Sequence, residues 1–430
     1  MNSKASIHIP AGAGFWRKLF AFMGPGLLIA VGYIDPGNWA TDISAGAKYG
    51  YQLLFIVLLS NFLAMLFQYL SLKLGIASGR DLAQACRDRY SKPVVIFLWL
   101  LCEVAIIACD LAEVIGSAIA LNLLFGMPLI VGVMITALDV IVILAVQSKG
   151  FRYLEALVAG LMFVIGAAFV YEILAAHPQW LGVAAGFIPT PKVIVDPGML
   201  YVAIGIIGAT VMPHNLYLHS SIVQTRAFDR DDAGKSMAVK YATIDVVSAL
   251  TIAFFINAAI LVLSAAAFHG TGNQNVADIN DAYHLLTPIL GASMASMLFA
   301  VALLASGQSS TLTGTLAGQI VMEGFLDLRI RPWVRRIITR LVAVIPAVGV
   351  AAWVGAKGLG QLLVLTQVIL SFQLAFAVVP LVVFTSDKRF MGRFTNCIWL
   401  KVSGWLAAIL IIGLNLLLIG QVVALCTRKF

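Results

Sequence analysis

Charged residues are scarce in this sequence, and their scarcity excludes a soluble protein of this size. Of its 430 residues 11% are charged and 61% are hydrophobic, whereas a soluble domain has about 25% and about 45–50%. The mean hydropathy is +0.97. So few charges cannot cover a water-facing surface, and the apolar residues come in long uninterrupted blocks. The sequence therefore predicts an integral membrane protein.

Cysteine is also rare, and its spacing excludes a disulfide framework or a zinc site. The five cysteines are an odd number, and none lies in a Cys-x-x-Cys pair. No Asn-x-Ser/Thr glycosylation acceptor is present. The common hydrolase and phosphate-loop motifs are also absent, so no enzyme is predicted. The net charge of +8 could suggest nucleic-acid binding. However, the basic residues form short clusters between apolar blocks, which is typical of membrane topology.

Eleven apolar blocks approach or exceed the roughly 20 residues that a helix needs to cross a bilayer. They cover residues 22–44, 53–72, 94–118, 128–146, 153–175, 198–223, 241–268, 285–321, 337–353, 358–383 and 398–423. The eighth block is long enough for two spans, but charge bias favours one. With eleven spans and a cytoplasmic tail (residues 1–21), 23 of the 28 Lys and Arg lie on the cytoplasmic side. We expect an all-α protein with its C-terminus outside.

Two of these blocks carry a proline near mid-membrane. The first contains the motif DPGN at 35–38 and the sixth contains MPHN at 212–215. Proline breaks helix hydrogen bonding, and a bound cation would satisfy the freed carbonyls. Each half has five spans, from the first to the fifth and from the sixth to the tenth, and this odd number means that the second half is inverted relative to the first. The pattern indicates inverted repeats over 22–175 and 198–383 with discontinuous helices, followed by an eleventh helix; two ordinary proline kinks are the alternative.

Asp35 is the strongest single candidate for a functional residue. A carboxylate near the bilayer centre costs free energy on insertion, and such a residue is functional by default. Asn38 adds an amide oxygen and Met212 adds a thioether. Sulfur favours transition metals over Ca²⁺ or Mg²⁺. An arriving divalent cation would also expel a proton from Asp35, which would couple metal to proton movement. A methionine that only fills the core is the plain alternative for Met212.

The paired motifs resemble the two signatures of the Nramp (natural resistance-associated macrophage protein) family. The eleven spans and the Arg-rich loop after the eighth span also match. The resemblance implies a LeuT-like fold and proton-coupled import of Mn²⁺ and Fe²⁺. It implies metal coordination by Asp35, Asn38, Met212 and the backbone carbonyl of Ala209. It also implies that Gln367, in the tenth span, reaches the metal when the site is occluded.

Three carboxylates of the third span provide a candidate proton path. Glu103, Asp110 and Glu113 share one helical face through spacings of seven and three. They could relay protons, or form an interhelical seam or a salt bridge to Arg335 or Arg336. The resemblance implies that Asp110 and Glu113 serve proton exit, together with an arginine after the eighth span.

Two histidines of the sixth span are further candidates. His214 adjoins the break and could titrate in the useful pH range; it could equally bind the metal, and the resemblance favours a proton or gating role. His219 lies about 140° further round the helix, so the two do not share a face. A packing histidine is the alternative for His219. The polar stretch at 307–313 of the eighth span predicts a close-packed helix interface rather than a solute pathway.

Other functions remain open at this point. A Mg²⁺-transporting relative of the same family and an amino-acid or sodium symporter of the same fold are the nearest alternatives. A fixed Asp35 would repel a carboxylate substrate, which speaks against the symporter. A passive channel would show a filter or charged rings. We expect a monomer in a bacterial inner membrane, with no cofactor and no nucleic-acid partner.

Overall fold

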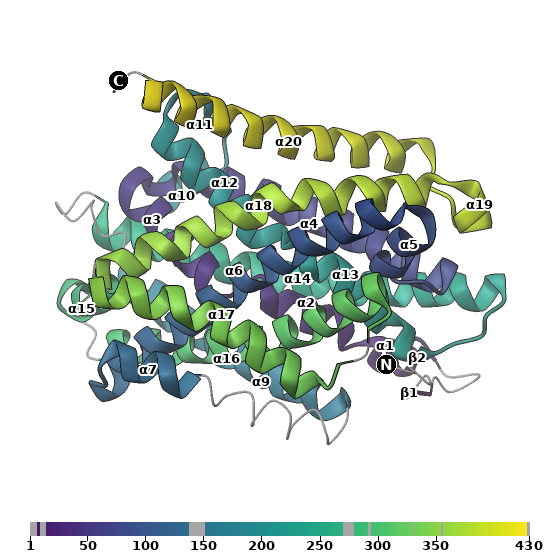
Figure 1. The fold of residues 1–430 in the computed structure, drawn as a ribbon. Coiled ribbons are helices and arrows are strands. Elements are labelled where there is room, and N and C mark those ends of the chain that lie inside the picture. Colours follow the sequence, from purple (N-terminus) through teal and green to yellow (C-terminus); the bar gives the residue numbers. More distant parts are fainter. Residues whose placement is uncertain are drawn as a thin grey trace.

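The computed structural model describes residues 7–8, 14–136, 151–269, 279–290, 294–328, 330–353 and 356–427, and these are almost wholly helical (Figure 1). Two short strands, β1 (Ile7–His8) and β2 (Arg226–Ala227), pair in parallel. The helices are α1 (Phe15–Phe22), α2 (Pro25–Gly32), α3 (Pro36–Tyr49), η1 (Gly50–Leu53), α4 (Leu54–Ser78), α5 (Leu82–Arg89), α6 (Lys92–Phe125), α7 (Leu129–Thr136), α9 (Phe151–Ala176), α10 (Trp180–Ala185), α11 (Lys192–Val195), α12 (Pro197–Val211), α13 (Pro213–Ile222), η2 (Val223–Thr225), α14 (Asp232–Phe268), α15 (Ile279–Leu290), α16 (Ala295–Leu326), α17 (Pro332–Trp353), α18 (Ala356–Ser386), α19 (Lys388–Met391), η3 (Gly392–Phe394) and α20 (Ile398–Thr427).

The chain is a multi-pass helical membrane protein. Within the described residues, eight stretches are long and apolar enough to span a bilayer, or nine if the bent pair α1–α2 counts as one. Three things separate this count from the eleven expected. The first two predicted spans join in the run Pro36–Ser78, and the fourth lies partly outside the described residues. The ninth contains only a shorter apolar helix, Ile337–Val350.

The eighth apolar block holds one long helix, but its predicted start at residue 285 is wrong. The helix α16 runs for 32 residues from Ala295. Residues 285–290 belong instead to α15, a separate helix of 12 residues. The apolar end of α15 adjoins α16 in the sequence, so hydropathy alone merges the two.

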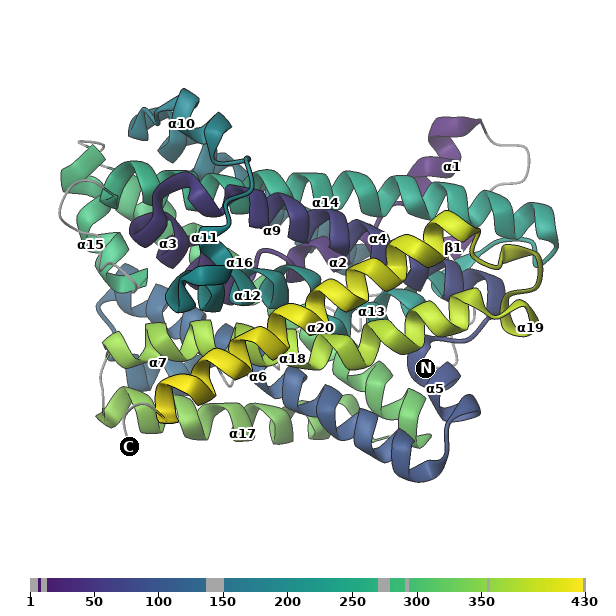
Figure 2. The same cartoon turned by 90° about the horizontal axis from the view of Figure 1, so that it is seen from above.

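The broken pairs α2–α3 and α12–α13 occupy the interior of the bundle. They pack against α4, α6, α14, α16 and α18, and Figure 1 shows these long helices running side by side. Of the apolar window in Pro197–Thr225, 94% is buried, against 28% in the window of α20. In Figure 2, α20 lies across one side of the bundle. A polar group at either break is therefore enclosed by protein.

The polar stretch of α16 forms the close-packed interface that the sequence predicts. The hydroxyls of Ser309, Ser310 and Thr311 bond to carbonyls of their own helix. Opposite α6, a methyl group added at Gly307 would lie 2.3 Å from the Ser117 hydroxyl. Because the hydroxyls are satisfied within the helix, α16 can pack closely without leaving polar groups exposed to lipid.

Candidate cation site at two helix breaks

The first break separates α2 from α3 at residues 33–35. Pro36 takes the first position of α3, where its missing N–H is no loss. Asp35 caps this helix: its Oδ1 accepts a hydrogen bond of 2.8 Å from the Asn38 backbone N–H. Its other oxygen, Oδ2, has no hydrogen-bond partner among the described residues, and the side chain is fully buried. One carboxylate oxygen thus caps α3, and the second is available to a ligand.

Side chains, rather than a cation, satisfy two of the carbonyls freed at this break. The Tyr33 carbonyl accepts from Asn257 Nδ2 at 2.7 Å. The Ile34 carbonyl accepts from Trp39 Nε1 at 3.1 Å and from Ser306 Oγ at 2.6 Å. Unpaired carbonyls are costly at hydrocarbon depth. These donors make the break stable by itself, so the expected role of a cation in satisfying the freed carbonyls is not required at these two positions.

The second break lies between α12 and α13 at Met212. Pro213 again occupies the first helical position, and the Asn215 backbone N–H donates to the Met212 carbonyl at 3.1 Å. The Asn215 side-chain amide lies 3.6 Å from the Met212 sulfur. Met212 is fully buried, as is Ala209 in the last turn of α12. The thioether therefore lies buried at the break, in contact with the Asn215 amide.

The close approach of two glycines shows what surrounds the first break: Gly32 lies against the second break, and Gly37 lies against α18. A methyl group added at Gly32 would lie 3.4 Å from the Met212 sulfur and 2.4 Å from Asn215 Nδ2. One added at Gly37 would collide with the side-chain amide of Gln367 at 1.8 Å. Gln367, from α18, therefore lies directly against the first turn of α3, and Met212 lies against the end of α2.

Several buried oxygen atoms around these breaks lack hydrogen-bond partners within the described part of the chain. Besides Asp35 Oδ2, they are Asn38 Oδ1, Asn215 Oδ1 and Gln367 Oε1. The described residues contain no group of three or more His, Cys, Asp or Glu that could hold a metal. A cation here would thus rely on one carboxylate, neutral oxygens and a sulfur. Such a set suits soft or intermediate cations better than Ca²⁺ or Mg²⁺.

Glu103 forms the salt bridge that the sequence left open as an alternative. It pairs with Arg335 of α17, Nη2 to Oε2, at 2.9 Å, and also accepts from Trp99 Nε1 at 3.1 Å. The side chain of Arg336 lies outside the described part of the structure. Glu103 and Arg335 therefore join α6 to α17 at one end of the acidic face.

Asp110 and Glu113 are fully buried in α6 and meet an arginine that the sequence analysis missed. Arg340 lies 3.7 Å from a Glu113 oxygen and donates to the Asp110 carbonyl at 3.3 Å. It also contacts the Thr311 hydroxyl at 3.2 Å. Arg340 falls inside the predicted ninth span, 337–353. An arginine inside a span was the signal for it.

The two histidines lie in different surroundings. His219 Nδ1 is 2.8 Å from Gln68 Oε1, and Gln68 Nε2 donates to the Tyr33 hydroxyl at 2.6 Å. The Gln68 oxygen must accept, so His219 carries its proton on Nδ1. His214 is buried, and its Nδ1 has no partner in the described residues. Of the two, His219 joins the hydrogen-bond chain that reaches Tyr33 at the first break.

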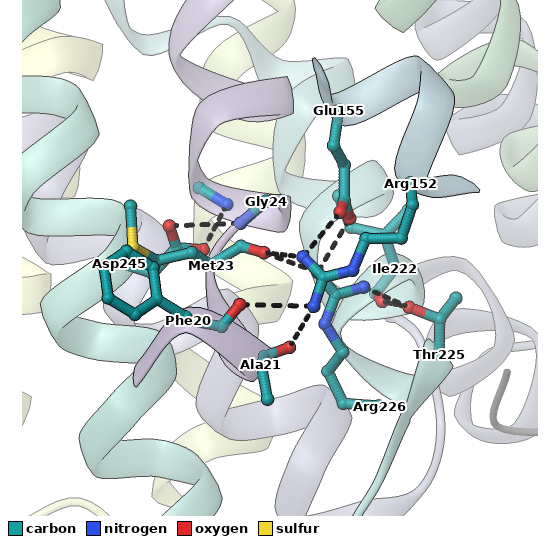
Figure 3. Close-up of polar contacts among 11 residues, drawn as sticks. Phe20, Ala21, Met23, Gly24, Arg152, Glu155, Ile222, Thr225, Arg226 and Asp245 are labelled. Carbon is teal, nitrogen blue, oxygen red and sulfur yellow. Dashed lines mark hydrogen bonds and ion pairs between the residues drawn. The ribbon is translucent and has the colours of Figure 1, made fainter. Parts of the chain in front are cut away.

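A second polar cluster, also missed in the sequence, fixes the hinge between α1 and α2 (Figure 3). Arg226 pairs with Glu155 at 2.7 Å and donates to the Met23 carbonyl at 2.9 Å. Arg152 bonds to the same carbonyl and to those of Phe20 and Ala21. Burial lowers the pKa of Arg226, and the neighbouring Glu155 carboxylate opposes this effect. The two guanidinium groups thus hold the end of α1.

Asp245 holds the other side of this hinge. Its carboxylate accepts from the backbone N–H of Gly26 at 2.7 Å and of Gly24 at 3.4 Å. Gly24 has φ +135°, and a methyl group there would lie 2.2 Å from the Glu155 carboxyl carbon. Only glycine fits this position. Glu155 and Asp245 each fall inside a predicted span, so the signal for them was again a charge at membrane depth.

The fold and the paired breaks define the class of protein. Two solved structures of low sequence identity share the fold alone. They are Mhp1, a nucleobase-cation-symport-1 family transporter (TM-score 0.61, 16% identity, 93% of each chain covered), and MhsT in complex with L-phenylalanine (TM-score 0.61, 13% identity, 91% of this chain and 98% of that one). The chain therefore shares the LeuT-like fold of these two proteins.

The chain belongs to the natural resistance-associated macrophage protein-like family, whose model matches residues 26–421. It is a transporter and not an enzyme. It is 61% identical to the "Divalent metal cation transporter MntH" of Listeria monocytogenes over 96% of this chain and 92% of that one. The relative of the same name from Nostoc is 60% identical over 97% and 94%. A crystal structure of the Eremococcus coleocola manganese transporter superposes with TM-score 0.89 at 42% identity, over 96% and 89%.

Proposed function

We propose that this protein imports divalent transition metal ions, Mn²⁺ and Fe²⁺, coupled to protons and by alternating access. Relatives named as divalent metal cation transporters and a manganese transporter of similar structure support the substrate class. The observation that carries the proposal is the unpartnered oxygen of the buried Asp35 carboxylate, at a break that faces Met212.

In this proposal the metal binds between the two breaks. Asp35 and Asn38 supply oxygens, Met212 supplies the thioether, and the Ala209 carbonyl completes the first set of ligands. Gln367 already lies against α3, so a small movement of α18 would bring its free oxygen to the metal. The carboxylate supplies the charge, and the sulfur discriminates against hard cations.

Protons leave along the acidic face of α6. Asp35 releases its proton when the metal binds, and Asp110 and Glu113 accept it near Arg340. The Glu103–Arg335 pair lies at the far end of this path; Arg336 is assigned to the same end. His214, with an unpartnered nitrogen beside Met212, gates proton access to the break. His219 holds Gln68 and, through it, the Tyr33 end of α2.

Alternating access requires two repeats that rock against each other. We assign them to residues 22–175 and 198–383, with a cytoplasmic tail at 1–21 and the eleventh helix at 398–423. The proposed setting is a monomer in the bacterial plasma membrane with eleven spans, the N-terminus in the cytoplasm and the C-terminus outside.

A Mg²⁺ transporter of the same family and a symporter for amino acids or sodium remain the competing functions. A buried thioether at the site is a poor ligand for Mg²⁺, and a fixed carboxylate repels an amino-acid carboxylate. Both observations favour transport of transition metal ions.

Uptake into proteoliposomes tests the proposal. We expect Mn²⁺ entry that an inward proton gradient stimulates, with acidification of the interior and no inhibition by excess Mg²⁺ or Ca²⁺. Full competition by Mg²⁺ would favour the magnesium transporter instead. Absence of any metal flux would favour the amino-acid or sodium symporter as the function.

A further inference from the structure

The short helix α1 lies at the edge of the bundle, at the same end as α5 and α19 (Figure 2). It is bent by 46° from α2, so it does not continue straight along the first broken helix. The basic residues of α5 and α19 lie at this end, which the charge bias of the sequence places in the cytoplasm.

One side of α1 is packed against the protein. Leu19 and Phe22 are buried, and the Phe22 ring stacks on Tyr241 of α14, with 5.7 Å between the ring centroids and 14° between the planes. Arg152 of α9 donates to the Phe20 carbonyl at 3.2 Å (Figure 3). These contacts on two neighbouring helices determine which sides of α1 face away from the protein.

The same two contacts give the depth of α1 in the membrane. Tyr241 is the first residue of the apolar block 241–268, and Arg152 directly precedes the block 153–175. Lys240, next to Tyr241, is exposed. Because both partners of α1 lie where an apolar block begins, α1 lies at the expected boundary between the acyl chains and the headgroups.

The outward sides of α1 combine aromatic and basic residues. Trp16 and Phe20 lie one turn apart and are 68% and 62% exposed. Arg17 is exposed and Lys18 is partly exposed, and neither side chain forms an ion pair with a described residue. A helix with aromatic residues on one side and basic residues on another is typical of a helix that lies in the membrane interface.

We propose that α1 binds anionic phospholipids of the adjoining membrane leaflet. Trp16 and Phe20 insert among the upper acyl chains, and Arg17 and Lys18 contact the phosphate groups, with Lys240 beside them. Charge favours this partner over a second copy of the chain, because α1 contains no acidic residue and two copies would bring like charges together. Since α1 leads into α2, the lipid contact anchors the first broken helix at the membrane surface.

The test measures lipid binding at α1 in the purified full-length protein in detergent. Phosphatidylglycerol with brominated acyl chains quenches nearby tryptophan, and the difference between the parent and Trp16→Phe isolates the signal of Trp16. We expect brominated phosphatidylglycerol to quench this signal at lower concentration than brominated phosphatidylcholine does.

Removing the two charges should weaken this binding. Arg17→Gln together with Lys18→Gln, compared with and without Trp16→Phe, should raise the Kd for phosphatidylglycerol about tenfold or more, since each basic residue contributes about fivefold at an anionic surface. The matched control is Lys388→Gln with Arg389→Gln. It removes two exposed charges at the same end of the bundle, from a helix without exposed large apolar side chains, and should leave the Trp16 signal unchanged.

Three outcomes would overturn the proposal. Equal quenching by the two lipids, with no effect of the double variant, would remove the preference for anionic headgroups. Quenching of Trp16 by aqueous iodide and not by brominated lipid would place α1 in water. Protection from both quenchers, with a dimer in light scattering, would show that a second copy covers α1. No measurement here requires metal uptake, so the result is independent of the proposed transport function.

Discussion

At the scale of single residues, Asp35 combines a structural and a chemical role through its two oxygens. One oxygen caps α3 and the other has no partner within the described residues. An asparagine can accept the same capping hydrogen bond but carries no charge. Substituting this residue therefore separates the fold from the chemistry.

We expect Asp35→Asn to fold normally and to lose Mn²⁺ uptake to the background of empty liposomes. The neutral amide keeps the cap, while the only carboxylate at the two breaks is lost. Thermal unfolding in detergent, measured beside uptake, checks both halves of this expectation. Uptake at the parent rate would remove Asp35 from the metal site.

The buried pair of Glu113 and Arg340 leads to a prediction about protons. Glu113→Gln should slow proton entry at least tenfold, while the Kd for Mn²⁺ changes by less than about threefold, because the amide cannot take up a proton. The measurement is internal pH together with metal in the same vesicles. A loss of Mn²⁺ affinity with normal proton entry would contradict the proposed path.

At the scale of elements, the hinge of α1 and α2 is held from both sides. Arg152 and Arg226 bind the carbonyls at the end of α1, and Asp245 binds the amides at the start of α2 (Figure 3). These contacts fix the position of the hinge relative to α9, β2 and α14 in this structure.

Glu155 and Arg226 should behave as one unit when substituted. Because both are buried, Arg226→Gln or Glu155→Gln alone should cost about 3–5 kcal/mol by leaving one buried charge unpaired. The double variant should be much less destabilised than the sum of the single ones. Thermal unfolding of the four proteins gives this coupling directly. Additive effects would show that the 2.7 Å contact contributes nothing.

At the scale of the whole molecule, the topology determines which end of the bundle faces the cytoplasm. The charge bias of the sequence predicts that the basic loops lie in the cytoplasm. Lys48, exposed in the last turn of α3, and Lys388, exposed at the start of α19, should lie on opposite sides of the membrane.

An impermeant amine reagent added outside whole cells should modify Lys48 and not Lys388. Mass spectrometry of the purified protein measures both in one experiment, so each lysine serves as the control for the other. The opposite labelling would show that the proposed topology is inverted.

The sequence by itself determined the membrane class, the two breaks and the family. These depend on composition and on short motifs, which hydropathy and proline chemistry translate directly into structure. It also indicated Asp35, Asn38 and Met212, because charge and sulfur at mid-membrane are conspicuous. Span boundaries were predicted less well: α15 and α16 are apolar neighbours in the sequence, and hydropathy does not register that they are separate helices.

Only the tertiary structure decided which side chains meet. Arg340 reaches Glu113 although 227 residues separate them, and Arg226 reaches Glu155 across 71 residues. Cys109 joins Met212 in one cluster from another helix. Helical periodicity gives the face of a residue but not the partner of that face. The partner is set by how whole helices pack, and this depends on close contacts such as Gly116 on Pro36 that no local pattern encodes.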